Sequence, residues 1–403
     1  MATPHKENKG PLAGITVLDL SRILAGPTCS QLFGDMGADI IKVERPDFGD
    51  DTRKWGPPYM QDSDGNNTSE SAYYLSSNRN KRSIAIDISQ PYGQKIIHDL
   101  ATKADIFIEN YKVGALKKYQ LSYDDLKAIN PKLIYCSISG FGQTGPYADR
   151  PGYDFLIQAM GGIMSFTGEP EGDPMKTGVG IADVVCGLYS SSAILAALHH
   201  LKTSGEGQYI DISLLDSQLA WLVNGGLNYL TSGENPVRYG NGHPNIVPYE
   251  LFPANNGYFV LAVGNDAQFK RFCEFADVIE LANDEHYTTN ENRVQNRKTL
   301  IPKLRAITAQ HSMDHWIQGL ENCNVPCGPV NNMQQVFDDP QVKHREMQIE
   351  VAHPLAGKGT VDLIANPINF SVTPVSYRRH PPTLGEHTDE ILDEYLGKNS
   401  DDI

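Results

Sequence analysis

A single acid stands inside a long apolar segment of the chain, GVGIADVVCGLYSSSAILAALHHLK, from Gly178 to Lys202. The acid is Asp183, and the stretch from Val184 to Leu201 predicts a buried or half-buried helix. Two roles fit a carboxylate at the start of such a helix. It either caps the helix by accepting a backbone N–H of the first turn, or it is a reacting group held at the positive end of the helix dipole. The local sequence alone favours the cap.

Basic residues follow the expected strands in three groups. They are Lys42 and Arg45 in IIKVERP, Arg79, Lys81 and Arg82 in NRNKRS, and Lys112, Lys117 and Lys118 in NYKVGALKK. Each of these residues taken singly is typical of a solvated surface. Three groups along the carboxyl edge of a parallel sheet, where ligands bind in open α/β folds, predict a site for a polyphosphate.

Several common cofactor motifs are missing. The first strand–helix turn, DLSRILAGP, lacks G-x-G-x-x-G, and in GVGIAD the acid Asp183 takes the place of the third glycine. The chain carries no P-loop and no G-x-S-x-G elbow. Cys323 and Cys327 have no second pair at zinc-binding spacing, and His199 and His200 are typical of a helix surface. We expect neither a dinucleotide cofactor nor a metal.

Strands and helices alternate along the first half of the chain. Apolar runs predict strands at Ile15 to Leu20, in ADIIKVERP, at Ile106 to Glu109, at Leu133 to Ile138 and in GQYIDIS, with helical segments between them. This alternation predicts a Rossmann-like α/β domain with a parallel sheet.

Changes in composition divide the rest of the chain. Residues 231–250 are rich in Gly, Asn and Pro and predict a linker or loop, as does NVPCGPVNN. Between them, GYFVLAVG and several helical stretches predict a smaller α/β domain. We expect a large domain over residues 1–228, linkers and a small domain over 229–330, and a C-terminal tail over 331–403 that returns to the large domain.

The bulk composition narrows the class of protein. The chain has 403 residues and a formal net charge of −15, which argues against a nucleic-acid partner. We find no apolar run that approaches a membrane span and expect no membrane partner. The N-terminus, MATPHKENKGPLAG, resembles neither a signal nor a transit peptide. We therefore expect a cytoplasmic protein with six free thiols, the mitochondrial matrix being the alternative if the source is eukaryotic.

The whole chain resembles the class III CoA-transferases. The matching landmarks are LDLSRILAGP, GADIIKVERP, GDDTRKWGPP, NRNKRSIAID, IENY, GFGQTGP, RPGYD, IADVVCG and LGEHTDEIL, in the family's order over nearly all 403 residues. Within the family, GDDTRKWGPPY, GHPNIVPYELF and NNMQQVFDDPQV are similar to members that exchange CoA between succinyl-CoA and glutarate.

This resemblance implies a chemical role for Asp183, at the position of the family's acyl-accepting aspartate. Its carboxylate would attack a thioester to give a mixed anhydride, and the released CoA thiolate would convert the anhydride into an aspartyl-CoA thioester. Coenzyme A is then a substrate, and no permanently bound cofactor is expected. The helix N-terminus would keep Asp183 ionised while an apolar pocket keeps it poorly solvated.

The resemblance also implies the residues around the substrate. CoA contacts fall on Ile23, Leu24, Arg45, Ile86, Asn110, Tyr111 and Lys118. Tyr153 would lie near the acyl end, and Gly240, Gly242 and His243 would belong to a lid loop. The expected partners are acyl-CoA, small carboxylic acids and a second copy of the chain in an interlocked homodimer.

Two residues are candidates for one contact with the substrate. A dicarboxylate needs a partner for its distal carboxylate, and either Arg22 or His243 fits that role. The alternative role for Arg22 is an ordinary structural ion pair.

Two alternative functions remain beside CoA transfer between dicarboxylic acids. Another class III CoA-transferase or an acyl-CoA racemase is the alternative within the family. The family's racemases carry His at the position of Tyr153, so Tyr153 argues against racemisation, because a phenol is a poor base near neutral pH. A non-catalytic CoA-binding protein is the alternative of another class, and Asp183 argues against it.

Overall fold

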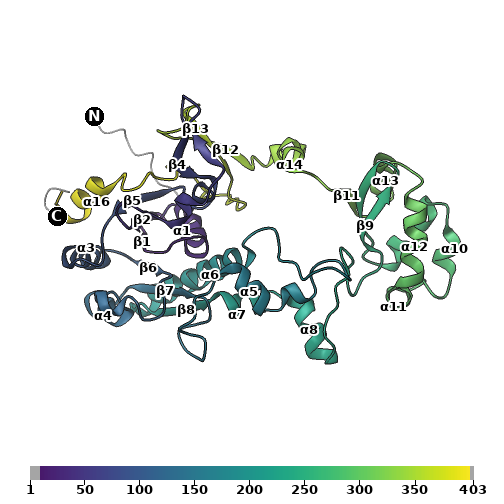
Figure 1. Ribbon diagram of the computed structural model, residues 1–403, viewed down its shortest axis with the longest axis horizontal. Coiled ribbons are helices and arrows are strands. Elements are labelled where there is room, and N and C mark those ends of the chain that lie inside the picture. The colour runs from purple at the N-terminus through teal and green to yellow at the C-terminus, as the bar shows by residue number, and fades with distance from the viewer. Residues whose placement is uncertain (1–9, 400–403) are drawn as a thin grey trace. The chain divides into compact units, whose positions relative to one another are not determined.

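The computed structural model describes residues 10–399 and divides into two compact units (Figure 1). The first unit comprises the chain up to Gly162, Thr177–Leu227 and the residues from Pro340 onward, and the second comprises Ile163–Lys176 and Asn228–Asp339. Two ranges lie outside the described residues, namely 1–9 and 400–403. The first belongs to the N-terminal segment that we expect to be neither a signal nor a transit peptide. The ranges 1–228, 229–330 and 331–403 stay a prediction.

A six-stranded parallel sheet forms the centre of the first unit. Its strands run in the order β5-β2-β1-β6-β7-β8. They are β1 (Thr16–Asp19), β2 (Asp39–Glu44), β5 (Lys81–Ala85), β6 (Ile106–Glu109), β7 (Ile134–Ser139) and β8 (Tyr209–Ser213). This is the doubly wound arrangement, which confirms the α/β prediction. The strand order reverses between β1 and β6, where a crevice for ligands opens at the carboxyl ends of the strands.

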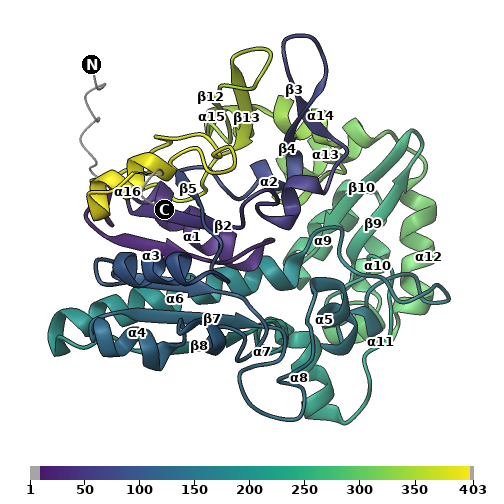
Figure 2. The same ribbon diagram turned by 60° about the vertical axis from the view of Figure 1, so that its left-hand side comes forward.

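Helices cover both faces of this sheet (Figure 2). They are α1 (Ala25–Asp35), α3 (Pro91–Ala101), α4 (Tyr123–Ile129), α5 (Asp154–Met160), α6 (Ile181–Ser204), α7 (Leu214–Ala220) and α16 (Thr388–Leu396). Successive strand residues point to opposite faces, so Val17 packs in the core with α1 and α6 while Leu18 packs in the core with α3, α4 and α16.

Helix α6 begins three residues earlier than the sequence predicts. Its N-cap is Gly180, so Asp183 is the third residue of the helix, and the prediction that Asp183 caps it is wrong. By length and composition, α6 is long and apolar enough to cross a membrane. This corrects the expectation that no apolar run approaches the length of a membrane span. Its buried residues, among them Cys186 and Ile194, pack in the core with residues of α1.

Close packing joins α6 to α1 at a glycine. A Cβ atom at Gly187 would lie 2.5 Å from the carbonyl oxygen of Ala25. Only a glycine therefore allows the two helix backbones to approach this closely.

The remaining elements of the first unit lie in loops and in the C-terminal segment. They are two antiparallel hairpins, β3 (Tyr59–Gln61) with β4 (Asn67–Ser71) and β12 (Gln348–Ala352) with β13 (Thr360–Ile364), and the short helices η1 (Asp51–Lys54), α2 (Ala72–Leu75), η2 (Lys117–Tyr119) and α15 (Pro340–His344). The C-terminal segment also covers the outer edge of β5. There Ser83 O accepts the His387 N–H at 2.9 Å, and Ala85 N–H donates to Thr388 Oγ1 at 3.2 Å.

The second unit has an antiparallel sheet in the order β11-β10-β9, packed with helices around Phe259 and Trp316. Its elements are η3 (Ile163–Ser165), β9 (Tyr249–Ala254), β10 (Gly257–Ala262), α9 (Asp266–Phe275), α10 (Ile279–Asn283), α11 (Asn290–Gln295), α12 (Arg297–Thr308), α13 (Met313–Asn322), β11 (Cys327–Pro329) and α14 (Met333–Asp338), while α8 (Val223–Ser232) spans the boundary between the units. The second predicted linker contains β11, because Cys327–Pro329 pairs with β10.

Candidate active site

A cavity of about 210 Å³ at the carboxyl edge of the parallel sheet brings several of the expected site residues together. Its walls come from the loops after β1, β6 and β7 and from the first turn of α6. The expected residues that line it are Arg22, Ile23, Leu24, Asn110, Tyr111, Tyr153 and Asp183. Lys112 and Arg150 add two further cationic side chains to the lining.

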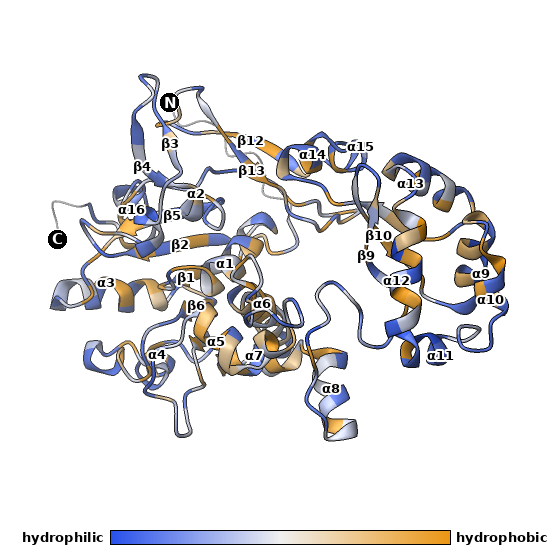
Figure 3. Cartoon of the chain, turned by 45° about the vertical axis from the view of Figure 1, so that its right-hand side comes forward, coloured by the Kyte–Doolittle hydropathy of each residue, from blue (hydrophilic) through white to orange (hydrophobic). Residues whose placement is uncertain are grey.

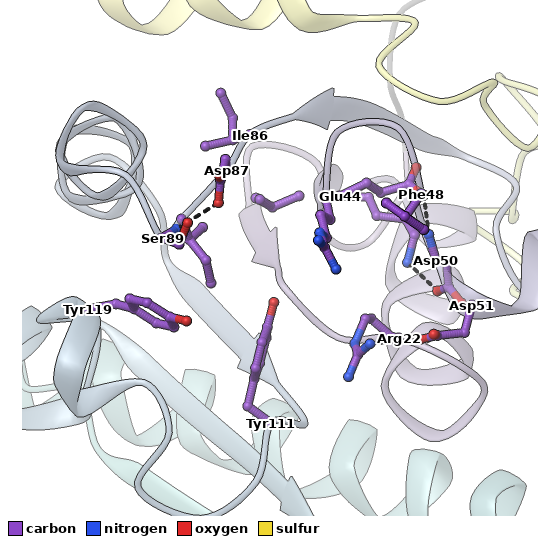
Figure 4. A pocket seen from close by; sticks show the side chains of 15 residues that line it. Arg22, Glu44, Phe48, Asp50, Asp51, Ile86, Asp87, Ser89, Tyr111 and Tyr119 are labelled. Carbon is purple, nitrogen blue, oxygen red and sulfur yellow. Dashed lines mark hydrogen bonds and ion pairs between the residues drawn. The ribbon is translucent and has the colours of Figure 1, made fainter.

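A second cavity, of about 450 Å³, lies in the same unit and is shown in Figure 4. Arg45 and Ile86 line it, together with Phe48. Arg22 and Tyr111 line both cavities. Lys118 is exposed, with its ammonium 4.6 Å from the ring centre of Tyr119, which lines the larger cavity.

The expected role of the NRNKRS group is wrong. These residues precede β5 or begin it, at the amino edge of the sheet, and they are buried in ion pairs. Arg79 pairs with Asp35 at 2.6 Å and Arg82 with Glu394 at 2.6 Å, while the buried Lys81 ammonium lies 3.5 Å from Asp19.

Lys42 is also not available to bind a phosphate. It is fully buried and pairs with Asp50 at 2.9 Å. Arg45, by contrast, is exposed, and its guanidinium lies 4.6 Å from the ring centre of Phe48.

Asp183 is half-buried, and burial followed by the nearby Asp154 carboxylate raises its pKa to about 7. The expectation that the helix N-terminus keeps Asp183 ionised stays a prediction. Desolvation and a like charge both disfavour the carboxylate form and so raise this pKa.

Asp154, the first residue of α5, supplies the cap that Asp183 does not. Its Oδ1 accepts the backbone N–H of Ala182 at 2.8 Å and that of Asp183 at 3.4 Å. Gln158 holds Asp154 in turn through an Nε2–H···Oδ2 bond of 2.7 Å. The sequence reasoning missed this residue, although its signal, an acid directly after Tyr153 in RPGYD, was visible.

A second missed neighbour is Tyr73 of α2. Burial, followed by the charges of Asp183 and Asp154, raises the pKa of Tyr73 to about 12, so its phenol stays protonated. No motif in ESAYYL marks this tyrosine.

The loop after β1 is held from several sides. Asn110 Oδ1 accepts the Arg22 N–H at 2.9 Å, and Asn110 Nδ2 donates to Arg22 O at 2.7 Å. The Arg22 guanidinium pairs with Asp51 at 2.7 Å and lies 5.5 Å from the ring centre of Tyr111. The Asn110 side chain is thus committed to joining the loops after β1 and β6.

The remaining expected residues, Gly240, Gly242 and His243, lie in the second unit, between α8 and β9. Gly240 N–H donates to Gly168 O at 3.0 Å, and His243 Nδ1 accepts the Asn245 N–H at 3.1 Å. Partial burial and the Arg297 charge lower the pKa of His243. The role of these residues as a lid stays a prediction.

Comparison with known proteins defines the class. The model of CoA-transferase family III matches residues 12–388, and the chain belongs to this family of enzymes, which act on CoA thioesters.

Individual relatives cover almost the whole chain. It is 49% identical to succinate–glutarate CoA-transferase of Agrobacterium fabrum over 97% of both chains. It is 45% identical to succinyl-CoA:glutarate CoA-transferase of Homo sapiens over 96% of this chain and 87% of that one. Among solved structures, a CAIB/BAIF family protein from Brucella suis is 47% identical and superposes with a TM-score of 0.84, covering 96% of this chain and 100% of that chain.

Proposed function

We propose that this enzyme transfers CoA between dicarboxylic acids, with succinyl-CoA as donor and glutarate as acceptor, through covalent intermediates on Asp183. The names and identities of the relatives support the substrate pair. The observation that carries the mechanism is the Asp183 carboxyl, half-buried in a cavity beside a sheet edge where α/β folds bind ligands.

The chemistry needs a carboxylate that both attacks and leaves. An Asp183 oxygen attacks the thioester carbon of succinyl-CoA, the C–S bond breaks, and CoA leaves as a thiolate. The thiolate attacks the aspartyl carbonyl of the anhydride, releases succinate and forms the aspartyl-CoA thioester. A glutarate oxygen attacks that thioester, the C–S bond breaks, and the CoA thiolate leaves an aspartyl–glutaryl anhydride. The thiolate then attacks the glutaryl carbonyl, forms glutaryl-CoA and releases the Asp183 carboxylate.

The two cavities suit the two ends of an acyl-CoA. We place the nucleotide in the larger one, where the exposed Arg45 meets phosphate, and the thioester in the smaller one beside Asp183. Arg22 and Tyr111 line both, so they would border the passage of the pantetheine arm.

Trapping the intermediate tests this proposal. Wild-type enzyme incubated with succinyl-CoA and then with hydroxylamine or borohydride should carry the modification on Asp183, read by peptide mass spectrometry. Asp183→Asn should lose both the label and CoA exchange, because an amide is a poor nucleophile. Asp216→Asn is the matched control, since Asp216 is also the third residue of its helix, α7, but is exposed. Wild-type turnover in Asp183→Asn would refute the mechanism.

Selection of a dicarboxylate is tested at Arg22 and His243. Arg22 lines the Asp183 cavity and can offer its planar fork to a distal carboxylate, although Asp51 already partners it. Arg22→Leu should lower kcat/KM for glutarate by about tenfold more than for pentanoate, since a charge-assisted hydrogen bond is worth roughly 1.5–3 kcal/mol. If His243→Gln, and not Arg22→Leu, lowers kcat/KM more for glutarate than for pentanoate, His243 is the partner of the distal carboxylate. Equal losses for both acids in Arg22→Leu would show that Arg22 does not have this role.

We also propose that the enzyme acts as a homodimer. Neighbouring helices of the first unit expose large apolar side chains, namely Phe155 and Leu156 on α5, Leu188, Tyr189 and Leu195 on α6, and Leu219 on α7. Figure 3 shows hydrophobic, orange stretches along α5 and α7. Exposed apolar patches of this kind mark interaction sites. A second copy of the chain should cover them, so Leu188→Glu should convert a dimer into a monomer in analytical ultracentrifugation. A monomeric wild type would refute this part.

A further inference from the structure

The loop between β1 and α1 holds a backbone conformation that its sequence disfavours. Ile23 has a φ of +73°, in the left-handed region that a β-branched residue rarely adopts. Such a conformation persists only where surrounding contacts impose it. Ile23 lines the cavity that contains Asp183, so whatever imposes this backbone also shapes that cavity.

A buried ion pair contacts the loop on both sides of Arg22. Both carboxylate oxygens of Asp50 lie 3.2 Å from the Ile23 nitrogen and accept its N–H. Lys42 Nζ donates to Asp50 Oδ2 at 2.9 Å and to Ser21 O at 3.1 Å. Asp50 and Lys42 are 1% and 0% exposed, so water does not compete for these bonds.

Asp50 is itself fixed by the chain around it. Its Oδ1 accepts the Thr52 N–H at 3.0 Å and the Thr52 hydroxyl at 2.8 Å, and its own N–H donates to Glu44 Oε2 at 2.8 Å. Every Asp50 oxygen is thereby committed to the protein. Asp50 is placed to hold the loop rather than to react.

We propose that Asp50, backed by Lys42, is a positioning residue that holds the left-handed backbone at Ile23 and so sets the shape of the Asp183 cavity for acyl transfer. This inference rests on the proposed role of Asp183. It gives Asp50, the first acid of GDDTRK, a role in positioning the site. Asp50 follows β2, whereas the loop that it holds follows the neighbouring strand β1.

The test replaces Asp50 by Asn, which keeps the shape but removes the charge that serves both Lys42 and Ile23. The matched control is Glu70→Gln. Glu70 is another fully buried carboxylate in an ion pair, with Arg53 at 2.7 Å, and it also accepts the Ser69 hydroxyl at 3.0 Å, so these two bonds lie outside the β1–α1 loop. Both variants should lower Tm, because each leaves a buried cation short of its partner.

Only Asp50→Asn should impair the chemistry. We expect its kcat to fall by about tenfold or more with the acyl-CoA KM changed less than about threefold, the pattern of a lost transition-state interaction. Glu70→Gln should keep kcat within about twofold, measured at a temperature where both variants are folded. Equal losses in the two variants, or an unchanged kcat in Asp50→Asn, would overturn the proposal.

A second set of variants keeps the test decisive if Asp50→Asn does not fold. Thr52→Val removes the 2.8 Å hydroxyl bond to Asp50 and leaves Lys42 paired, so kcat should fall while the fold persists. An unchanged kcat in folded Thr52→Val would then overturn the proposal. The trapping experiment separates the Asp183 mechanism from the positioning role of Asp50. A wild-type enzyme that is not labelled refutes the Asp183 mechanism. A labelled wild type, with equally rapid labelling in the Asp50 or Thr52 variant, refutes only the positioning role.

Discussion

At the scale of the residue, the role proposed for Asp183 requires a side chain that is ionised, so that it can attack, and poorly solvated, so that it is reactive. Its pKa of about 7 reconciles the two, since a large fraction is ionised at neutral pH. We predict that kcat/KM for succinyl-CoA rises with pH to a plateau, with a half-maximum near pH 7, and falls about tenfold per pH unit well below it. Initial rates between pH 5.5 and 9 check this, and a flat profile would contradict it.

Asp154 should set the position of that titration. Asp154→Asn removes the second charge that raises the pKa of Asp183, while its amide oxygen can still accept the Ala182 N–H. We predict that the half-maximum of the pH profile moves to lower pH. Asp216→Asn on α7 serves as the control and should leave the profile in place. A profile that stays fixed in Asp154→Asn would show that burial alone raises the pKa.

The raised pKa of Asp183 also predicts a pH-dependent stability. Because the folded-state pKa lies above the ordinary value of 3.8, the native state binds more protons between about pH 4 and 7, and stability falls as pH rises through that range. Asp183→Asn removes this cost. Its Tm should exceed that of wild type at pH 8 by about 2 °C or more, and by less at pH 5, in calorimetry. A Tm difference that does not grow with pH would contradict the assignment.

At the scale of the element, the strands were predictable and the start of α6 was not. The strand from Ile106 to Glu109 begins with three consecutive apolar residues, Ile106 to Ile108, and an apolar run of that kind is a local signal for a buried strand. The first turn of α6 depends on Asp154, a residue 28 positions earlier that caps Ala182. No local pattern contains such a tertiary contact.

The same limit explains the misplaced basic group. NRNKRS resembles a solvated or phosphate-binding segment because its neutralising acids, such as Asp35 and Glu394, lie far away in sequence. The loops after β1, β6 and β7 that line the Asp183 cavity follow recognisable strands, but the individual residues expected there came from the resemblance to the class III CoA-transferases. The Ile23 backbone was not, since isoleucine gives no sign of a positive φ.

Gly187 offers a test of the α1–α6 contact. A Cβ there would meet the Ala25 carbonyl at 2.5 Å, and neither backbone can yield without moving a helix. We predict that Gly187→Val lowers the free energy of unfolding by about 3 kcal/mol or more. Gly178→Ala is the control, because a Cβ at Gly178 meets nothing within 4 Å, and its denaturation midpoint should stay near wild type. Equal midpoints for both variants would contradict this packing.

At the scale of the whole molecule, the C-terminal segment completes the first unit. Gly385, His387 and Thr388 bond to the outer edge of β5, and Glu394 pairs with Arg82. A chain ending at Leu384 should therefore expose an unpaired strand edge and a buried arginine without its partner. We predict aggregation on expression, read by size-exclusion chromatography. A chain ending at Gly397 keeps these contacts and should elute as wild type, and identical behaviour of both chains would contradict the prediction.

This late closure also has a consequence for synthesis. The ribosome releases β5 some three hundred residues before His387, whose N–H bonds to Ser83, is made. Throughout that interval the nascent sheet presents an open edge, and the second unit is translated before the first can close. The first unit can therefore reach its final form only after the segment around His387 has been made, although its first strand emerges almost at once.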